Sequence, residues 1–373
     1  MIALFDPIDQ SRGDFIPWWR TSIADEDISE IVSAIRGEHI SMGPITARLE
    51  EKLAAALNVP FVVATTSGSA ALTLAMMALE IGPDDEIIVP DRTFIATAHA
   101  ATILGARAIL ADCLSNHPNV DPQQISRKIS ARTKAIAVVH LNGMACRIRE
   151  ISAIASAHGV PVIEDAAQAL FSCSEDGYLG TLGEVGCFSF GMTKLVSTGQ
   201  GGAVVTRNSI LYDKLRAMRN HGIRDTVSHE YLMSGNNFKF TDLQAAIGLG
   251  QIAQTAEKIE RCKAIYRAYR SGLNGLSGLS LLEVHVDGRE IALWVEIVSP
   301  RRDELSSYLA GRGIQTRKFL PSLHTAPHLA CGEDFPNSAW FDRAGMIIPS
   351  GPAQPMENVY RTIEAIREWS FKA

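Results

Sequence analysis

The stretch FVVATTSGSAALTLAMMAL, residues 61–79, joins an apolar run to a helix-forming run through a turn of small residues. The first five residues are typical of a buried strand, and residues 70–79 predict a helix. Similar apolar runs recur as far as residue 206, several of them separated by helical segments: EIIVP, RAILAD, KAIAVVH, PVIED, VGCFSF and GGAVVT. Continuous apolar strands that alternate with helices indicate an α/β fold with a mostly parallel sheet that is buried on both faces.

The pattern differs on either side of this region. Two helices are expected before it, over residues 25–36 and 44–57, where an acidic first turn and a proline mark their starts. After about residue 255 the expected elements are a long charged helix, one strand and two further helices, over residues 256–271, 291–298, 302–311 and 357–369. We therefore expect a large domain over residues 1–255 and a smaller α+β domain over residues 256–373.

Composition excludes several classes of function. The chain has 373 residues, a net charge of −6 and ordinary hydrophobic and charged fractions of 46% and 20%, so it lacks the basic footprint of a nucleic-acid or membrane-surface binder. No signal peptide and no membrane-spanning run is expected. The six cysteines are scattered without a CxxC pair. We expect a reduced, cytoplasmic protein with no zinc site or other metal and no disulfide framework.

Ligands of open α/β sheets bind beyond the carboxyl ends of the strands, so the residues that follow each strand are informative. The first strand is followed by Thr66-Ser67-Gly68-Ser69-Ala70 and then a helix. Small residues at a helix N-terminus can hold an anion through backbone N–H groups, but they are equally compatible with an ordinary helix cap. The turn matches neither a P-loop nor a GxGxxG fingerprint, which disfavours a nicotinamide dehydrogenase.

Other strand ends carry groups with more than one possible role. Glu164 and Asp165 are adjacent on one strand, so their side chains should point to opposite faces of the sheet. Asp165 either caps the next helix or pairs with a ligand cation such as a pyridinium nitrogen. His140 also follows a strand, and a lone histidine at the end of a strand more often has a structural role than a role in a ligand site. Phe94, taken alone, is favoured as a core residue, with stacking on a flat ligand as the alternative.

A single lysine follows the strand VGCFSF, within the stretch CFSFGMTKLVSTGQGGAVV of residues 187–205. Most loop lysines are solvated surface charges. Lys194, however, follows the hydroxyl of Ser189 by five residues, so one segment offers both an anion ligand and an amine. A lysine, an aspartate, a turn of small residues and an aromatic ring together are the components of a pyridoxal phosphate site.

At this point the sequence resembles the DegT/DnrJ/StrS-type sugar aminotransferases, which are fold-type-I enzymes dependent on pyridoxal phosphate. The segments that carry the resemblance are VVATTSGSAALTLAM, VPDRTFIATAHAATILGA, VIEDAAQAL, FSFGMTK, GQGGAVVT, MRNHGIRD and GNNFKFTDLQAAIGLGQI. It extends from about Ile40 to the C-terminus, with looser matches in RKFLPSLHTAPHL and IIPSGPAQPMENV. It implies a large domain with a mostly parallel seven-stranded sheet flanked by helices, and a smaller α+β domain.

The resemblance also implies residue roles. Lys194 would form the Schiff base with the cofactor, Asp165 would pair with its pyridinium nitrogen, Gln168 would contact the side of the ring hydroxyl, and Phe94 would stack on the ring. The phosphate would be held by Gly68, Ser69, Ala70 and Ser189. Asn237 would reach the phosphate of the neighbouring subunit, so a homodimer with shared sites is implied, and His324 would lie near the sugar substrate.

The chain departs from the family pattern at several places. The common SGT triplet is Ser67-Gly68-Ser69, a frequent arginine is Lys239, and Ala169-Leu170-Phe171 stand where a histidine often follows the DAAQ motif. Near His324, Phe319 and Leu320 stand in place of the usual tyrosine. The resemblance therefore specifies the cofactor chemistry more closely than the acceptor.

The function implied is transfer of an amino group from glutamate or glutamine, through pyridoxamine phosphate, to a keto-sugar. The acceptor would be a nucleotide-linked (dTDP-, UDP- or GDP-) keto-deoxy sugar in amino-sugar or polysaccharide biosynthesis. The alternatives are an aminotransferase for a cyclitol ketone of the scyllo-inosose type, a sugar dehydratase and a silent regulator with the same fold. The dehydratase branch resembles this fold but carries histidine in place of the lysine, so Lys194 argues against it.

Overall fold

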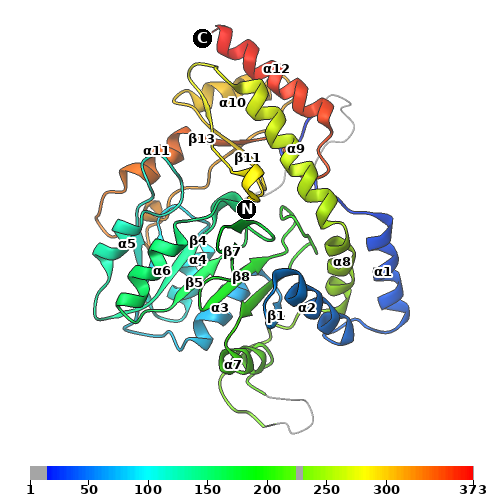
Figure 1. Cartoon of the computed structure of the whole chain (residues 1–373), viewed down its shortest axis with the longest axis vertical. Coiled ribbons are helices and arrows are strands. Elements are labelled where there is room, and N and C mark those ends of the chain that lie inside the picture. Colours follow the sequence, from blue (N-terminus) through cyan, green and yellow to red (C-terminus); the bar gives the residue numbers. More distant parts are fainter. Residues whose placement is uncertain (1–14, 224–229, 373) are drawn as a thin grey trace.

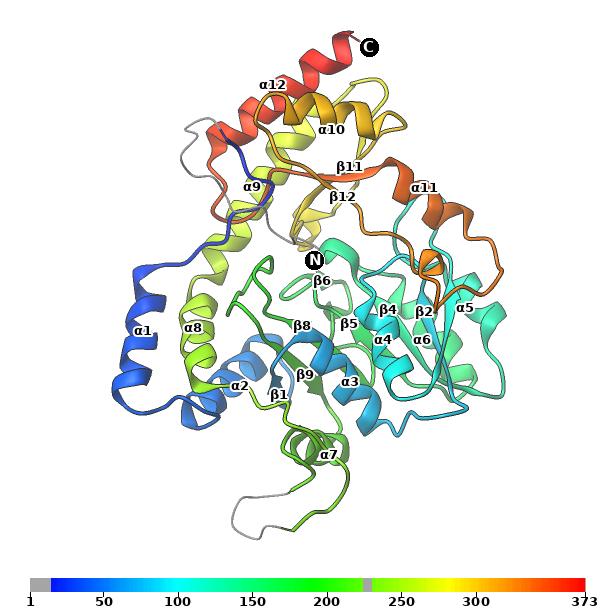
Figure 2. The same cartoon turned by 180° about the vertical axis from the view of Figure 1, so that it is seen from behind.

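The computed structural model describes residues 15–223 and 230–372. The end of the MRNHGIRD motif, residues 224–225, and the start of the chain, where a signal peptide would lie, are outside the described residues. Figure 1 shows a lower body built around a large sheet and an upper part that contains a second sheet, and Figure 2 shows the same arrangement from behind.

The large sheet has seven strands in the order β1-β9-β8-β5-β4-β2-β3. Each apolar run of the sequence forms one of them: β1 (Phe61–Thr65), β2 (Glu86–Pro90), β3 (Arg107–Ala111), β4 (Thr133–Val139), β5 (Val162–Asp165), β8 (Val185–Ser189) and β9 (Gly202–Thr206). β9 is antiparallel to its two neighbours, β1 and β8, and all other neighbouring strands are parallel. The mostly parallel α/β sheet predicted from the sequence is confirmed.

Helices cover both faces of this sheet because its strands are apolar on both faces. Ile87 and Val89 of β2 belong to one core cluster with residues of α3 (Gly68–Ala78), α4 (Ala96–Ile103) and α7 (Ser209–Arg219), whereas Ile88 belongs to another with residues of α5 (Pro122–Lys128) and α6 (Ile148–Ala157). The helices α1 (Asp25–Arg36), α2 (Pro44–Leu57) and α8 (Asp242–Ala253) lie together beside β1 (Figure 1). A small hairpin, β6 (Cys173–Ser174) and β7 (Gly177–Tyr178), follows β5.

The second sheet has four antiparallel strands, β10 (Ser280–Leu281), β11 (Val295–Val298), β13 (Gly345–Ile348) and β12 (Arg317–Lys318), in that order. The remaining helices are α9 (Thr255–Leu273), α10 (Arg302–Ala310), α11 (Pro336–Ala344) and α12 (Met356–Lys372), with three 3₁₀ turns at Leu141–Gly143, Val286–Gly288 and Leu323–Thr325. The helix α9 begins where the sequence places the domain boundary, and we keep the division at residues 255–256 as a proposal.

One strand of the second sheet is shorter than expected, and the N-terminal residues contact the C-terminal part of the chain. The strand predicted over residues 291–298 is only Val295–Val298, because the backbone N–H groups of Ile291 and Trp294 donate instead to Ser172 and Asn142 of the large-sheet loops. The N-terminal residues Ile16 and Trp19 form bridges with Ile314 and Ser350 of the C-terminal part. The hydrogen bonds of Ile291 and Trp294 hold the chain next to β11 against the loops of the large sheet.

The described residues contain no helix with the length and apolar character that a membrane span requires. All six cysteines are free thiols, and only Cys331 is exposed.

Candidate active site

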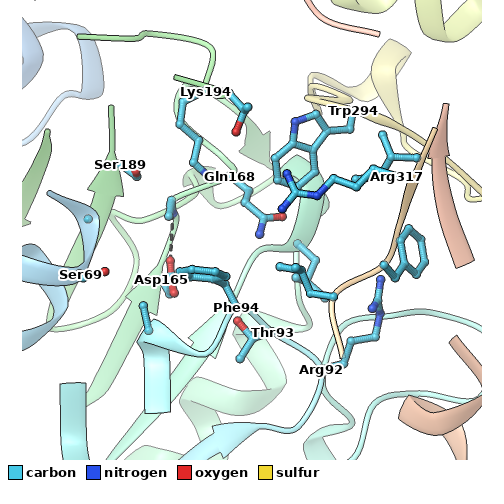
Figure 3. A pocket seen from close by; sticks show the side chains of 18 of the residues that line it. Ser69, Arg92, Thr93, Phe94, Asp165, Gln168, Ser189, Lys194, Trp294 and Arg317 are labelled. Atoms are coloured by element: carbon cyan, nitrogen blue, oxygen red, sulfur yellow. Dashed lines mark hydrogen bonds between the residues drawn. The ribbon is translucent and has the colours of Figure 1, made fainter. Parts of the chain in front are cut away.

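A cavity of about 390 Å³ lies beyond the carboxyl ends of β5 and β8, between the loops of the large sheet and residues of the second sheet. Figure 3 shows its lining from close by. Seven of the site residues expected from the sequence line it: Gly68, Ser69, Phe94, Asp165, Gln168, Ser189 and Lys194. Strand ends that are far apart in the sequence therefore meet at one pocket, as expected for an open α/β sheet.

The turn after β1 both caps a helix and lines the pocket. The Ser67 hydroxyl oxygen accepts a hydrogen bond from the Ala70 N–H at 3.0 Å, so Ser67 is the N-cap of α3. Gly68 and Ser69 open into the cavity, whereas Ala70 is buried behind them. A Cβ atom at Gly68 would lie 2.8 Å from the Cβ of Ser189, so only glycine lets β8 approach this turn. The result is a helix N-terminus with small residues facing the pocket, which favours an anion.

Asp165 ends β5 with its carboxylate in the pocket. One oxygen accepts a hydrogen bond from the Thr97 hydroxyl at 2.7 Å, and the other accepts from the Ala167 N–H at 3.1 Å. Burial raises the pKa of Asp165, while these two hydrogen bonds and the positive charge of Lys194 oppose the rise. The hydrogen bond from the Ala167 N–H resembles a helix cap and holds the side chain in place. The carboxyl group still faces the cavity, where a ligand could contact it.

Glu164 points to the opposite face of the sheet, as the alternation along the strand predicts. It accepts hydrogen bonds from the N–H groups of Gly180, Leu182 and Gly183, and it lies 2.7 Å from Nε2 of His140. Nδ1 of His140 accepts from the Cys146 N–H, so Nε2 carries the proton that His140 donates to Glu164. The structural interpretation of His140 is the correct one: this pair stabilises the loops beneath the pocket.

Lys194 lies in the turn that follows β8. Its N–H donates to the Gly191 carbonyl at 3.0 Å, and its side chain extends into the cavity (Figure 3). Within the described residues its amine has no hydrogen-bond or ion-pair partner, and it lies 5.2 Å from the centre of the Trp294 ring. Burial lowers the pKa of Lys194 to about 8; the carboxylate of Asp165 opposes this shift, and Arg317 adds to it. A large fraction of the amine is therefore neutral near pH 8 and can act as a nucleophile.

Phe94 and Gln168 offer a flat surface and a polar group. Phe94 is 51% exposed and lines the cavity, so it is not the core residue that its type alone suggests. The Gln168 carbonyl oxygen accepts a hydrogen bond from the Asn142 N–H at 2.8 Å. This contact fixes the orientation of the amide and leaves its NH₂ group for a ligand.

The far wall of the cavity consists of residues that the sequence did not single out. They are Trp18, Arg92, Trp294, Glu296, Arg317, Lys318 and Ile347. Most lie on or beside β11, β12 and β13, where no motif marks them. Arg92 is the exception, since it closely follows β2 and could have been found by the same strand-end reasoning that selected Phe94.

Besides Ala70, two of the expected site residues, Asn237 and His324, lie outside the cavity lining. Asn237 is exposed, with its backbone bridged to Asn220. His324 is held beneath the rim: its Nδ1 lies 2.8 Å from a carboxylate oxygen of Asp91, its N–H donates to the other oxygen, and its ring stacks on Phe335 at 5.0 Å. Within one chain, neither side chain reaches the pocket that contains Lys194.

The arrangement fits a flat ligand that carries a phosphate and a carbonyl group. The glycine-lined N-terminus of α3 suits the phosphate, the exposed face of Phe94 suits the ring, and the unpaired amine of Lys194 suits the carbonyl carbon. No group of three or more metal-ligating side chains occurs in the part of the chain that the structure describes. Pyridoxal phosphate is the cofactor that these residues fit.

Comparisons with known proteins agree with this chemistry. Residues 21–367 match the profile of the DegT/DnrJ/EryC1/StrS aminotransferase family. The chain is 35% identical to the dTDP-3-amino-3,4,6-trideoxy-alpha-D-glucose transaminase of Streptomyces venezuelae, over 88% of each chain. It is 31% identical to the GDP-perosamine synthase of Escherichia coli O157:H7, over 95% of this chain and 98% of that one. The crystal structure of S. venezuelae DesV with a ketimine intermediate superposes with a TM-score of 0.91 at 33% identity, covering 95% and 98% of the two chains.

Proposed function

Because the chain belongs to the DegT/DnrJ/EryC1/StrS aminotransferase family and is an aminotransferase dependent on pyridoxal phosphate, we propose that it aminates a nucleotide-linked keto-sugar with glutamate or glutamine as donor. The observation that carries the proposal is the meeting of Lys194, Asp165 and the N-terminus of α3 in one cavity. Relatives named for GDP-, dTDP- and UDP-linked amino sugars support the class of acceptor.

The residues would hold the cofactor from three sides. The backbone N–H groups of Gly68 and Ser69 and the Ser189 hydroxyl would bind the phosphate, with Ala70 behind them in the same helical turn. Phe94 would cover the ring, and Gln168 would contact its hydroxyl. Asp165 would face the pyridinium nitrogen, whose positive charge would compensate for the burial of the carboxylate.

When bound, pyridoxal phosphate supplies an electron sink for negative charge that develops at the substrate carbon. Lys194 would hold the cofactor covalently at rest; once an amino donor has displaced it, the free amine would take the proton from the donor carbon and deliver it to the former carbonyl carbon of the cofactor, on the other side of the shared nitrogen. Its lowered pKa, about 8, allows it to accept and release that proton near neutral pH. Asp165 would stabilise the positive charge of the ring nitrogen.

We further propose that the active unit is a cytoplasmic homodimer. Asn237 matches a family position that reaches the neighbouring subunit, and its exposure on the single chain leaves it available for such a contact. Sedimentation of the pure protein as a single-chain species at assay concentrations would contradict the homodimer.

The test is to load the protein with pyridoxamine phosphate and follow the loss of its absorbance with a panel of keto-sugar nucleotides and scyllo-inosose. We expect a nucleotide keto-sugar to react and the cyclitol ketone not to react. In the complete assay with glutamate, Lys194→Ala should abolish turnover. The other lysine among the described residues that line the cavity, Lys318, is paired with Asp303 and cannot replace the lost amine. Turnover of Lys194→Ala at the wild-type rate would refute the assignment.

A further inference from the structure

Three cationic side chains line the cavity in addition to Lys194, and their contacts differ. Lys318 forms an ion pair with Asp303, with 2.7 Å between Nζ and the carboxylate oxygen. Arg92 is 6% exposed and packs over the ring of Phe319, with its guanidinium carbon 4.1 Å from the ring centre. Arg317 lines the cavity, is partly exposed and has no ion pair with a carboxylate among the described residues.

The position of Arg317 is fixed by rigid elements. Its backbone pairs with Ile347 of β13, and its guanidinium carbon lies 5.0 Å from the centre of the Trp18 ring. Figure 3 shows the side chain extending across Trp294 toward the side of the pocket where Gln168 and Lys194 lie. Its charge acts on the Lys194 amine, since it contributes to the lowered pKa of that group.

An unpaired guanidinium in a partly desolvated pocket is a binding group for an anion. Burial lowers the pKa of Arg317, which means that removal from water is unfavourable for its charge. A carboxylate would relieve this cost through two parallel N–H···O hydrogen bonds. The structure therefore offers a carboxylate site next to the amine that is expected to move the proton.

Resting on the proposed function, we propose that Arg317 binds the α-carboxylate of the amino-acid donor and so selects α-amino acids over other amines. In an α-amino acid the carboxylate is bonded directly to the carbon from which Lys194 must take the proton, so the two groups have to be recognised side by side. In a nucleotide-linked sugar the charged diphosphate is separated from the keto carbon by ring atoms. An anion site close to Lys194 matches the donor better than the acceptor.

The test separates the two half-reactions of the holoenzyme. In Arg317→Gln we expect the concentration of glutamate needed for half-maximal conversion to the pyridoxamine form to rise about 10- to 100-fold, the loss expected for a charge-assisted hydrogen-bonded pair. Measured well above pH 8, where the Lys194 amine is mostly neutral with or without Arg317, the reaction with 4-aminobutanoate, which has no α-carboxylate, should change much less than the reaction with glutamate. Arg317→Lys should recover part of the loss, because it keeps the charge but not the fork of N–H groups.

The matched control is Arg312→Gln, which removes another arginine of the C-terminal part that lies over an aromatic ring, that of Tyr308, and is absent from the cavity lining. It should react with glutamate as wild type does. A calorimetric titration with glutarate, an unreactive dicarboxylate, should show the same weakening in Arg317→Gln and not in Arg312→Gln.

Wild-type behaviour of Arg317→Gln toward both glutamate and glutarate would overturn the inference. So would a loss confined to the acceptor half-reaction, which would assign Arg317 to an anionic group of the sugar nucleotide. Failure of the wild type to react with either glutamate or glutamine would refute the proposed function instead, and the glutarate titration would still decide whether Arg317 is a carboxylate site.

Discussion

At the scale of single residues, the charge state of Lys194 depends on neighbours that the sequence places far apart. The pocket walls remove water from the amine and lower its pKa to about 8, Asp165 opposes the shift, and Arg317 adds to it. Below this pKa the amine is protonated and cannot attack a carbonyl; above it the amine is neutral. We therefore expect the rate at which the cofactor-free protein captures pyridoxal phosphate to rise with pH, with a midpoint near 8. Stopped-flow absorbance measures this rate.

Two variants should move the midpoint of this pH dependence in opposite directions. Asp165→Asn removes the negative charge that favours the ammonium form, so its midpoint should move to lower pH. Arg317→Gln removes a positive charge, so its midpoint should move to higher pH. A midpoint near 10.5, the ordinary value for lysine, would show that the amine is solvated in the free protein, and shifts in the reverse directions would contradict the charge effects of Asp165 and Arg317.

At the scale of elements, the approach of α3 to β8 depends on one glycine. We expect Gly68→Ala to weaken pyridoxal phosphate binding about 10-fold or more, because the new methyl group would lie 2.8 Å from the Ser189 Cβ and would displace a side chain of the phosphate site. Equilibrium titration of the cofactor-free protein measures the affinity. Gly82→Ala is the control, since nothing lies within 4 Å of a Cβ at that position.

The double variant Gly68→Ala, Ser189→Gly shows whether the steric explanation is correct. The same clash should lower the thermal stability of Gly68→Ala. Removing the Ser189 side chain creates room for the methyl group, so this stability should return in the double variant although the hydroxyl is absent. Strictly additive losses in the double variant would mean that the Gly68 effect arises elsewhere.

The elements that could be predicted are those whose signal is local. Each apolar run between residues 61 and 206 that is predicted to be a strand forms a strand, because burial on both faces requires continuous apolar residues. The opposite directions of Glu164 and Asp165 follow from strand alternation alone. The far wall could not be predicted, because Trp294 and Arg317 reach the cavity through the docking of the second sheet, and no local pattern encodes that contact. Trp294 illustrates the reason: its N–H and carbonyl are held by the Asn142 side chain.

At the scale of the whole molecule, two buried side chains of opposite ordinary charge, Arg92 and Glu296, line the cavity from the two sheets. Arg92 follows β2 of the large sheet, and Glu296 lies on β11 of the second sheet. Burial raises the pKa of Glu296 to about 7, although the positive charge of Arg92 opposes the rise. One oxygen of this carboxylate and Nε of Arg92 have no hydrogen-bond partner among the described residues. The contact between the sheets therefore retains a carboxyl group that folding drives toward its protonated form.

This pair predicts a specific dependence of stability on pH. The pKa of Glu296 is about 7 in the folded protein and near its ordinary value of 4.5 in the unfolded chain, so the folded state binds more protons between these values. Stability contributed by this group is therefore lost as pH rises from about 4.5 to 7, by roughly 3 kcal/mol for a shift of this size. Because glutamine does not titrate, the thermal midpoint of Glu296→Gln should rise relative to wild type between about pH 5 and pH 8.

Comparing the two proteins at each pH cancels the contributions of the titrating groups that they share, and Arg92 stays charged over this range. The control is Glu304→Gln, which removes an exposed carboxylate whose pKa is lowered by its hydrogen bond with Arg301, so its difference from wild type should not change above about pH 5. A constant difference for Glu296→Gln over the same range would mean that water reaches the carboxylate and that the two sheets are joined less closely than the buried pair implies.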